Sequence, residues 1–449
     1  MNRRNFISHS IGASIAGPAI INELSGISEN GTYSGNMLPQ QIKSPQETKL
    51  IVKPVMTNMY HTDMWEGPCR FNVVSSEQER KNALTSFESF KKRIGAKEYG
   101  IDSANVSMLE PALLLFVEDF KLKEEDLKKL DAEAMSADVL LVDPSGSSVA
   151  TYDLAVRYKK PVVIAWGLNC RTVDISAYCR SKGHEVFIPD SKSGISDIMA
   201  LLRARKILAN TRILYPTDWG WPSVASVAGI NEPYALKEKF GTELKRISYA
   251  ELSSAVESTK KNSSEMRLAS EMAETVYNNA EKSYIEKQYV ARSMEFYLSV
   301  VSLMNKYNCN AFTIECFEFC SSRLPQKWQI TPCLLHTMFK DLGISSACEG
   351  DLGGLLSMNL LMSVSKKSPH FGNMFMGENG VMEINHSVPG IRMNGFSEAP
   401  LKYQLGRFVE AGWGTKVVVD FMQNNEKNIT VLCPYCLLNN IICVFGWMQ

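Results

Sequence analysis

The sequence predicts an α/β protein, and two observations lead to this class. Short, fully apolar runs such as Val139–Val142 and Pro161–Ile164 are separated by a helical segment over residues 150–158. Strands that are buried on both faces of a parallel sheet have this continuous apolar pattern, with helices between them. After Phe371 the pattern changes to short strands joined by turns rich in Gly, Asn and Pro. We therefore expect two Rossmann-like parallel-sheet domains followed by a smaller β domain.

The elements divide the chain into three domains. The first α/β domain is expected over residues 48–206 and begins with a strand at Leu50–Val52. The second is expected over residues 207–370, and the β domain over residues 371–449. Predicted strands of the last two domains cover residues 213–215, 311–314, 344–347, 381–384, 416–420 and 429–431, and predicted helices cover residues 333–342 and 355–364. A long helical stretch carries apolar residues at four-residue spacing, namely Leu268, Met272, Val276, Ala280 and Tyr284.

The composition is that of a globular protein. The 449 residues are 45% hydrophobic and 21% charged, and their length favours two or three domains. The 48 Lys and Arg residues balance the 48 Asp and Glu residues. A nucleic-acid-binding or membrane-surface protein needs a basic excess, so the charge argues against both classes. The sequence has no apolar run of about 18 residues or more, so we expect no membrane-spanning helix.

The N-terminus predicts export. Arg3 and Arg4 precede Phe6 and a mildly apolar, Gly/Ala-rich stretch that ends at Ile21. This pattern resembles a bacterial twin-arginine signal, so we interpret residues 1–47 as an export signal and linker and expect a periplasmic protein. A flexible basic N-terminus on a cytoplasmic protein is the alternative.

The main candidates for a functional site are Glu349 and Asp351, which lie between a predicted strand and a predicted helix. Ligands of open α/β sheets bind at the carboxyl ends of strands, and two carboxylates there suit a hard divalent cation such as Mn²⁺ or Mg²⁺. The same acids could instead cap the following helix, whose N-terminus favours negative charge. The spacing alone does not separate these interpretations.

His386 and Glu315 are further candidates. His386 lies between a predicted strand and Pro389, a setting in which a histidine is more often structural than a ligand. Near a carboxylate pair it would complete a mixed nitrogen and oxygen metal site. Glu315 and Glu318 follow the strand at residues 311–314, so they could face the same sheet edge as Glu349 or simply be solvated.

A Cys-Pro-Tyr-Cys motif at Cys433 and Cys436 copies the redox pair of glutaredoxins. A thioredoxin-like fold needs several strands and helices after this motif, and too few residues follow it here. We therefore give a thiol oxidoreductase little support.

Four segments, taken together, resemble a known family. Residues 331–334, 341–344, 348–351 and 385–389 contain Thr-Pro-Cys-Leu, Asp-Leu-Gly-Ile, Cys-Glu-Gly-Asp and a His-Ser-x-Pro pattern. In this order they are similar to motifs of the L-fucose isomerase and L-arabinose isomerase superfamily. The predicted domain order fits the three-domain plan of that family.

The resemblance implies a function and a site. The family interconverts aldoses and ketoses with Mn²⁺ or another divalent cation, moving a proton between C1 and C2 through an ene-diol. By this analogy Glu349 and Asp351 are metal ligands and proton-transfer groups, and His386 is the imidazole ligand. Glu315 and Glu318 are the weaker candidates for a second catalytic acid. The family also implies a small sugar as substrate and a homo-oligomer.

The chain departs from the family at its end. No histidine follows His386, where relatives carry a late metal-binding histidine, and the tail beyond Leu432 does not resemble a barrel strand. We therefore expect the chain to be truncated or frameshifted near residue 432 and the β domain to be incomplete. A carbohydrate-binding protein without catalysis is the alternative function, in which Trp219 and Trp221 could stack on a sugar or merely pack.

Overall fold

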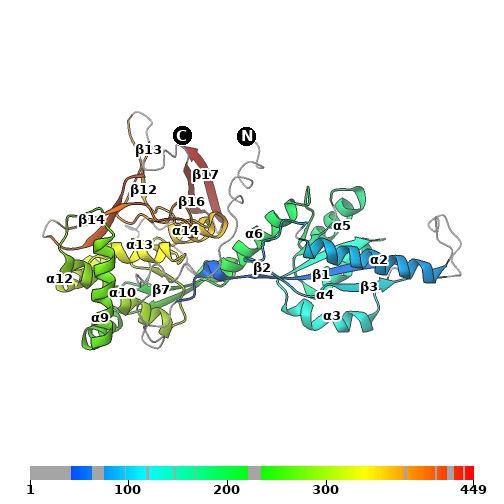
Figure 1. The fold of residues 1–449 in the computed structure, drawn as a ribbon, viewed down its shortest axis with the longest axis horizontal. Coiled ribbons are helices and arrows are strands. Elements are labelled where there is room, and N and C mark those ends of the chain that lie inside the picture. Colours follow the sequence, from blue (N-terminus) through cyan, green and yellow to red (C-terminus); the bar gives the residue numbers. More distant parts are fainter. Residues whose placement is uncertain are drawn as a thin grey trace. The chain divides into compact units, whose positions relative to one another are not determined.

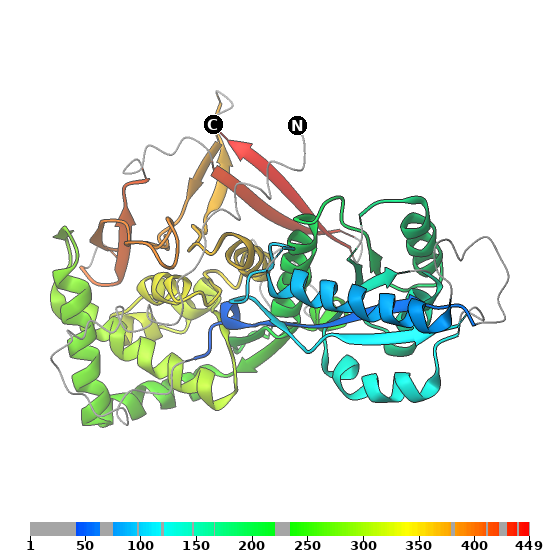
Figure 2. The ribbon, with the colours of Figure 1, turned by 45° about the vertical axis from the view of Figure 1, so that its right-hand side comes forward.

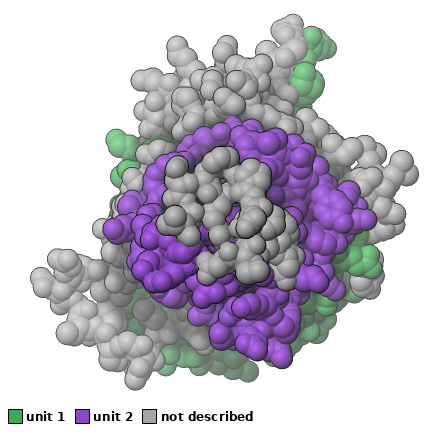
Figure 3. Space-filling model, turned by 90° about the vertical axis from the view of Figure 1, so that its right-hand side faces the viewer, with its two compact units in different colours: residues 1–47, 204–449 green, residues 48–203 purple. Residues whose placement is uncertain are grey.

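The computed structural model describes residues 42–62, 75–96, 98–117, 121–145, 148–165, 167–220, 234–378, 382–409, 412–421, 429–437 and 440–448. Arg3, Arg4 and the apolar segment that follows them lie outside these residues. The chain divides into two compact units (Figure 3). One unit holds residues 48–203, and the other holds residues 204–449 together with the N-terminal residues up to Glu47.

The unit of residues 48–203 is a parallel sheet with helices on both faces (Figure 1). Its strands are β1 (Leu50–Met59), β2 (Val106–Met108), β3 (Ala112–Phe116), β4 (Val139–Ser145), β5 (Val162–Ile164) and β6 (Val186–Phe187). The strand order is β2-β1-β4-β5-β6, with β3 also paired to β1, and every pairing is parallel. The helices are α2 (Ser76–Gly95), α3 (Glu124–Ser136), α4 (Val149–Tyr158), α5 (Cys170–Ser181) and α6 (Gly194–Ala209), which crosses the unit boundary.

The packing of β4 explains why its first four residues, Val139–Val142, are all apolar. Leu140 and Val142 pack in the core under α3 and α4, whereas Val139 and Leu141 pack in the core on the opposite face, with residues of α6. Successive side chains of a strand point to opposite faces, so a strand covered on both sides needs an apolar residue at every position. The α/β prediction is confirmed.

The unit of residues 204–449, green in Figure 3, is built on a four-stranded parallel sheet of order β11-β10-β7-β8. We call it the second unit because most of it follows residues 48–203 in the chain. Its strands are β7 (Arg212–Pro216), β8 (Glu243–Ile247), β10 (Ala311–Thr313) and β11 (Ser346–Ala347). The helices of this unit are α7 (Tyr234–Phe240), α8 (Tyr249–Lys261), α9 (Ser263–Asn278), α10 (Lys287–Lys306), α11 (Cys316–Ser321), α12 (Leu324–Trp328), α13 (Cys333–Asp341) and α14 (Leu352–Ser365). One face of the sheet packs against α8, α10 and α13, and the other face packs against α14 and Leu236 of α7.

The predicted long helix around Leu268 is wrong in its C-terminal part. Helix α9 ends at Asn278, and Lys282–Ser283 forms the short strand β9, which pairs with a later strand instead of continuing the helix. Tyr284 is 54% exposed and lies outside the apolar face of α9. The backbone pairing of β9 ends the helical period that the spacing predicted.

The remaining strands are antiparallel hairpins. They are β12 (Asn373–Met376) with β13 (Met382–Asn385), β14 (Tyr403–Arg407) with β15 (Thr415–Val419), and β16 (Ile429–Leu437) with β17 (Asn440–Met448). Strand β16 runs beside α14, and Figure 2 shows the β16–β17 hairpin in red. Strand β16 continues past Leu432, where the sequence had not suggested a barrel strand.

The residues just before β1 are held on the second unit. Pro45–Glu47 forms a 3-10 helix, and the Ser44 hydroxyl donates a hydrogen bond to the carbonyl of Gly343 over 3.0 Å. The Gln46 amide donates to Asn359 of α14 over 3.3 Å. Residues 44–47, which the sequence placed in a linker, therefore pack against the unit that contains β11 and α14.

Candidate functional site

Three neighbouring parallel strands end at one edge of the second sheet. Strand β11 leads into Glu349, β10 leads into Glu315, and β7 leads into Thr217 and Asp218. The pairing of Thr313 with Ala347 places the first two of these segments side by side. The sequence-predicted acids therefore gather at the carboxyl ends of adjacent strands, where α/β proteins bind their ligands.

The carboxylate of Glu349 is contacted on both of its oxygens. Oε1 lies 3.4 Å from Nε2 of His386, and Oε2 accepts a hydrogen bond from the side-chain amide of Asn373 over 3.4 Å. Asn373 begins β12 and His386 follows β13, and the register pairs Asn373 with Asn385. Both partners of Glu349 therefore come from the open end of the β12–β13 hairpin. Hydrogen bonding to His386 lowers the pKa of Glu349 below its usual value, which favours the carboxylate.

The backbone at Glu349 and Gly350 is unusual. Both residues adopt the left-handed backbone conformation, with φ of 60° at Glu349 and 65° at Gly350. A left-handed conformation costs a residue with a Cβ about 1–2 kcal/mol, and such costs are concentrated at functional sites. The N–H of Gly350 donates to the carbonyl of Ile314 over 2.9 Å, which ties this turn to the segment after β10.

Asp351 acts as the N-cap of α14. Its Oδ1 accepts a hydrogen bond from the N–H of Gly354 over 2.7 Å. Burial raises the pKa of Asp351 to about 6, and the nearby charge of Glu349 acts in the same direction. The sequence left open whether Asp351 caps a helix or binds a cation. In the structure its Oδ1 caps the helix.

Glu315 is a fully buried carboxyl group. It caps α11 by accepting a hydrogen bond from the N–H of Glu318, while its Oε1 has no hydrogen-bond partner in the described part of the chain. Gly350 covers it, since a Cβ at that glycine would lie 3.3 Å from Cγ of Glu315. Burial raises the pKa of Glu315, so the protonated acid is favoured relative to an exposed glutamate.

The carboxyl group of Glu318 is hydrogen-bonded to the loop after β7. Its Oε2 accepts from the hydroxyl of Thr217 over 2.7 Å, and its Oε1 accepts from the backbone N–H groups of Asp218 and Trp219 over 2.5 and 2.8 Å. A buried carboxylate that accepts three hydrogen bonds fixes the loop after β7. The contacts of Glu318 therefore hold the loop after β7 in place. Of the two glutamates, Glu315 is the one whose carboxyl group interacts with the charge of Glu349.

Helix α13 holds the segment that follows His386. The hydroxyl of Thr337 donates to the carbonyl of Pro389 over 2.7 Å, and the ammonium of Lys340 donates to the carbonyl of Val388. Asp341 accepts the N–H of Ile391 over 2.9 Å and the next N–H along the chain over 3.1 Å. These contacts fix the approach of His386 to Glu349. In the sequence, their only signal is the presence of charged residues on an amphipathic helix.

Lys340 and Asp341 are both buried. Burial lowers the pKa of Lys340 to about 7 and raises the pKa of Asp341 to about 6. His336, one turn before Lys340, is also buried and lies 2.7 Å from the hydroxyl of Ser346 through Nδ1. Its contacts are those of a core residue.

The structure brings two of the three predicted cation ligands into contact. Glu349 and His386 meet, and Asp351 is close enough to Glu349 for their charges to interact. Within the described ranges, no group of three or more His, Cys, Asp and Glu side chains is arranged to hold a metal ion. The donor types nevertheless fit one, because a carboxylate and an imidazole suit a divalent transition metal. Nδ1 of His386 is also buried and has no hydrogen-bond partner among the residues that the structure describes.

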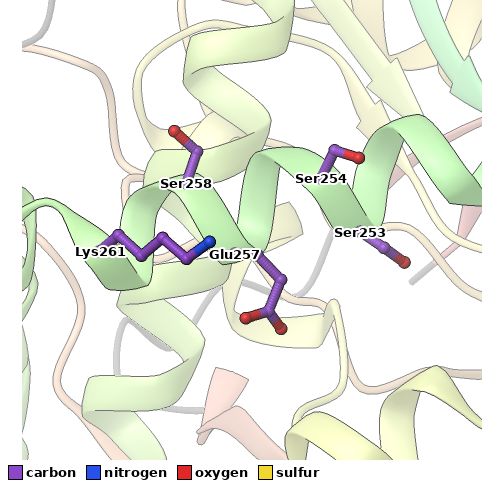
Figure 4. Close-up of a pocket in the computed structure, with 5 residues that line it drawn as sticks. All are labelled: Ser253, Ser254, Glu257, Ser258 and Lys261. Carbon is purple, nitrogen blue, oxygen red and sulfur yellow. The ribbon is translucent and has the colours of Figure 1, made fainter.

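The sequence also singled out two tryptophans and a Cys-Pro-Tyr-Cys motif. Trp219 is 57% exposed at the end of β7, and Trp221 is outside the described residues. Cys433 and Cys436 belong to strand β16, whereas a redox motif of the glutaredoxin type needs a helix start. A shallow hollow along α8 is lined by Ser253, Ser254, Glu257, Ser258 and Lys261 (Figure 4). All five residues come from one helix, and none belongs to the predicted site.

Comparison of the chain with models of known protein families and with curated proteins finds no match. The resemblance to sugar isomerases therefore remains a prediction from the motifs. None of the described helices combines the length and the apolar character needed to cross a membrane.

Proposed function

We infer that the chain is a metal-dependent sugar isomerase, which binds Mn²⁺ or a similar divalent cation at Glu349 and His386 and interconverts an aldose and a ketose. One observation carries the proposal: a carboxylate and an imidazole lie 3.4 Å apart beside the buried carboxyl group of Glu315, at the ends of adjacent parallel strands. The motif resemblance supports the same reaction.

Glu349 and His386 are the first two ligands in this proposal. Both side chains are mostly buried, and each is presented by a backbone segment that other hydrogen bonds hold in place. Asp351 is the third candidate ligand, through Oδ2, while Oδ1 continues to cap α14. A divalent cation held here would polarise two sugar oxygens and stabilise the negative charge that develops on them.

Glu315 is the proposed proton carrier. A carboxyl group whose pKa is raised by burial takes up and returns a proton more readily near neutral pH than an exposed glutamate does. In the isomerisation it would accept the proton from C2 of an aldose and return it to C1. Because Gly350 covers Glu315, this role requires the turn at Glu349 and Gly350 to move when the sugar binds.

Metal analysis combined with a substrate panel tests the proposal. The full-length protein would be loaded with Mn²⁺, and its metal content would be measured with a panel of aldoses assayed for ketose formation. We expect bound Mn²⁺ and turnover of at least one aldose, and we expect Glu349→Gln to lose both. A protein that retains neither Mn²⁺ nor any other divalent cation would contradict the proposal.

A carbohydrate-binding protein without catalysis is the second candidate. Trp219 favours it, because the exposed indole stands at the ligand-binding edge and Glu318 fixes its backbone N–H. Tryptophan faces commonly stack on apolar surfaces of ligands. Sugar binding that is lost in Trp219→Ala and unchanged by removal of divalent cations would favour this function over the isomerase.

Export and assembly complete the proposal. We propose that the twin-arginine pattern at Arg3 and Arg4 directs the folded protein out of the cytoplasm and that the chain forms homo-oligomers. Cell fractionation of the Arg3→Lys, Arg4→Lys double variant tests the first part, since a functional signal would leave the variant in the cytoplasm. Sedimentation of the purified protein tests the second.

A further inference from the structure

Two cysteine thiols, each adjacent in sequence to an acid of the candidate site, lie in contact with each other. Cys316 follows Glu315 at the start of α11, and Cys348 precedes Glu349 after β11. Their sulfur atoms lie 2.8 Å apart, although the two residues are separated by 32 positions in the sequence. Both cysteines are free thiols in this structure.

The backbone around the two thiols is already in register. Thr313 pairs with Ala347 in the parallel sheet, and the N–H of Gly350 donates to the carbonyl of Ile314 over 2.9 Å. Ala347 and Gly350 flank Cys348, and their partners Thr313 and Ile314 both precede Cys316. A disulfide has a bond length of about 2.05 Å, so a small rotation of the two side chains would bring the sulfur atoms to bonding distance.

The two thiols differ in accessibility. Cys348 is buried in the apolar cluster that contains Leu352, Leu355 and Phe371, whereas Cys316 is only partly buried. A reagent from solvent therefore reaches Cys316 first, and Cys348 is placed to react with the product. Access governs which thiol reacts first in thiol–disulfide exchange, and an accessible cysteine beside a resolving cysteine is common in redox-sensing pairs.

We propose that Cys316 and Cys348 form a reversible dithiol–disulfide pair, which is closed by exchange with a small-molecule disulfide such as oxidised glutathione. The Cys316 thiolate attacks one sulfur of the reagent, forming a mixed disulfide and releasing one glutathione thiolate. The Cys348 thiolate then attacks the Cys316 sulfur, forming the protein disulfide and releasing the second glutathione thiolate. The two cysteine protons pass through solvent to the released thiolates, so two protein thiols are oxidised and one glutathione disulfide is reduced.

The disulfide would join the segments that carry Glu315 and Glu349. The turn that covers Glu315 would then be tied covalently to α11, in addition to its hydrogen bond to Ile314. This modification site does not depend on the proposed isomerase activity, because it rests only on the positions of the two thiols.

Peptide mapping of the oxidised full-length protein tests the inference. The protein would be incubated with oxidised glutathione, denatured in the presence of N-ethylmaleimide and digested with trypsin without reduction. Trypsin releases residues 341–366, in which Cys348 is the single cysteine, and residues 307–323, which contain Cys309, Cys316 and Cys320. We expect these two peptides to be joined, with fragment spectra that place the bond at Cys316, and we expect dithiothreitol to restore both thiols.

Variants locate the bond. Cys320 is exposed one turn after Cys316 on α11, so Cys320→Ser is the matched control and should give the same cross-link. Cys348→Ser should leave a glutathione mixed disulfide on Cys316. A wild-type cross-link through Cys320 or Cys333, or full alkylation of Cys348 after oxidation, would overturn the proposal. The wild-type map decides the question even where a variant folds poorly.

Discussion

Nε2 of His386 lies 3.4 Å from Oε1 of Glu349, although the two residues are 37 positions apart in the sequence. Glu349 is held by the turn after β11, and His386 by the segment that α13 anchors. The pair is therefore a product of two separately stabilised segments. Its properties can be tested apart from any activity.

Removal of either member should weaken cation binding. Glu349→Gln keeps the size of the side chain and removes its charge, and His386→Gln removes the imidazole. Because each change deletes one ligand, we expect the Kd for Mn²⁺ measured by calorimetry to rise about tenfold or more, which corresponds to at least about 1.4 kcal/mol. Glu383→Gln is the matched control, since Glu383 is exposed on β13 three residues before His386. If the wild type and the three variants bound Mn²⁺ with the same Kd, Glu349 and His386 would not be ligands of the cation.

Glu318→Gln should destabilise the second unit. The substitution places an amide donor where Glu318 now accepts three hydrogen bonds, two of them from backbone N–H groups. A lost hydrogen bond to a charged group costs about 1.5–3 kcal/mol, so we expect the free energy of unfolding to fall by about that amount in urea titrations. Glu257→Gln, on the exposed face of α8, should leave it unchanged. An unaltered midpoint for Glu318→Gln would show that Glu318 does not fix the loop after β7.

Gly350→Ala should cost more than its backbone conformation alone explains. A left-handed φ of 65° makes a residue with a Cβ less stable by about 1–2 kcal/mol, and the new Cβ would also press on Glu315 from 3.3 Å. Gly183 has a φ of 83° and open space around its Cβ position, so Gly183→Ala measures the conformational cost alone. We expect thermal unfolding to show the larger loss for Gly350→Ala. Equal losses would mean that the turn yields to the added methyl group.

Lys340 should make stability depend on pH in the alkaline range. Burial lowers its pKa in the folded state to about 7, from an unfolded value of 10.5. Between these values the unfolded lysine binds a proton that the folded lysine does not, so the free energy of unfolding rises with pH, by up to about 1.4 kcal/mol per pH unit. This stability is present above pH 10.5 and is lost as the pH falls through about 7.

Lys340→Met should remove that dependence. The variant keeps the apolar part of the side chain and loses the titrating group, so its unfolding midpoint should change less between pH 7 and 9 than that of the wild type. Lys327→Met, on α12, is the control and should follow the wild type. A wild-type midpoint that falls with rising pH over this range would contradict the assignment.

The order of strands and helices could be predicted because burial on both faces of a parallel sheet leaves a direct mark on the sequence. The apolar run at Val139–Val142 and the apolar helix that follows Asp351 both appear where the pattern placed them. The end of α9 could not be predicted in the same way. Residues 282–283 leave the helical pattern because they pair with β14, and β14 lies more than a hundred residues later in the chain.

The sequence by itself determined which acids stand at strand ends, since Glu315 and Glu349 each follow a strand after one residue and the chain gives each strand its direction. Only the tertiary structure decided how each acid is used. Asp351 caps a helix, Glu318 fixes a loop, Glu315 is buried, and Glu349 meets His386, because each depends on partners that folding brings from distant segments. Side-chain partners at such distances leave no period in the sequence, whereas burial of a strand or a helix face does.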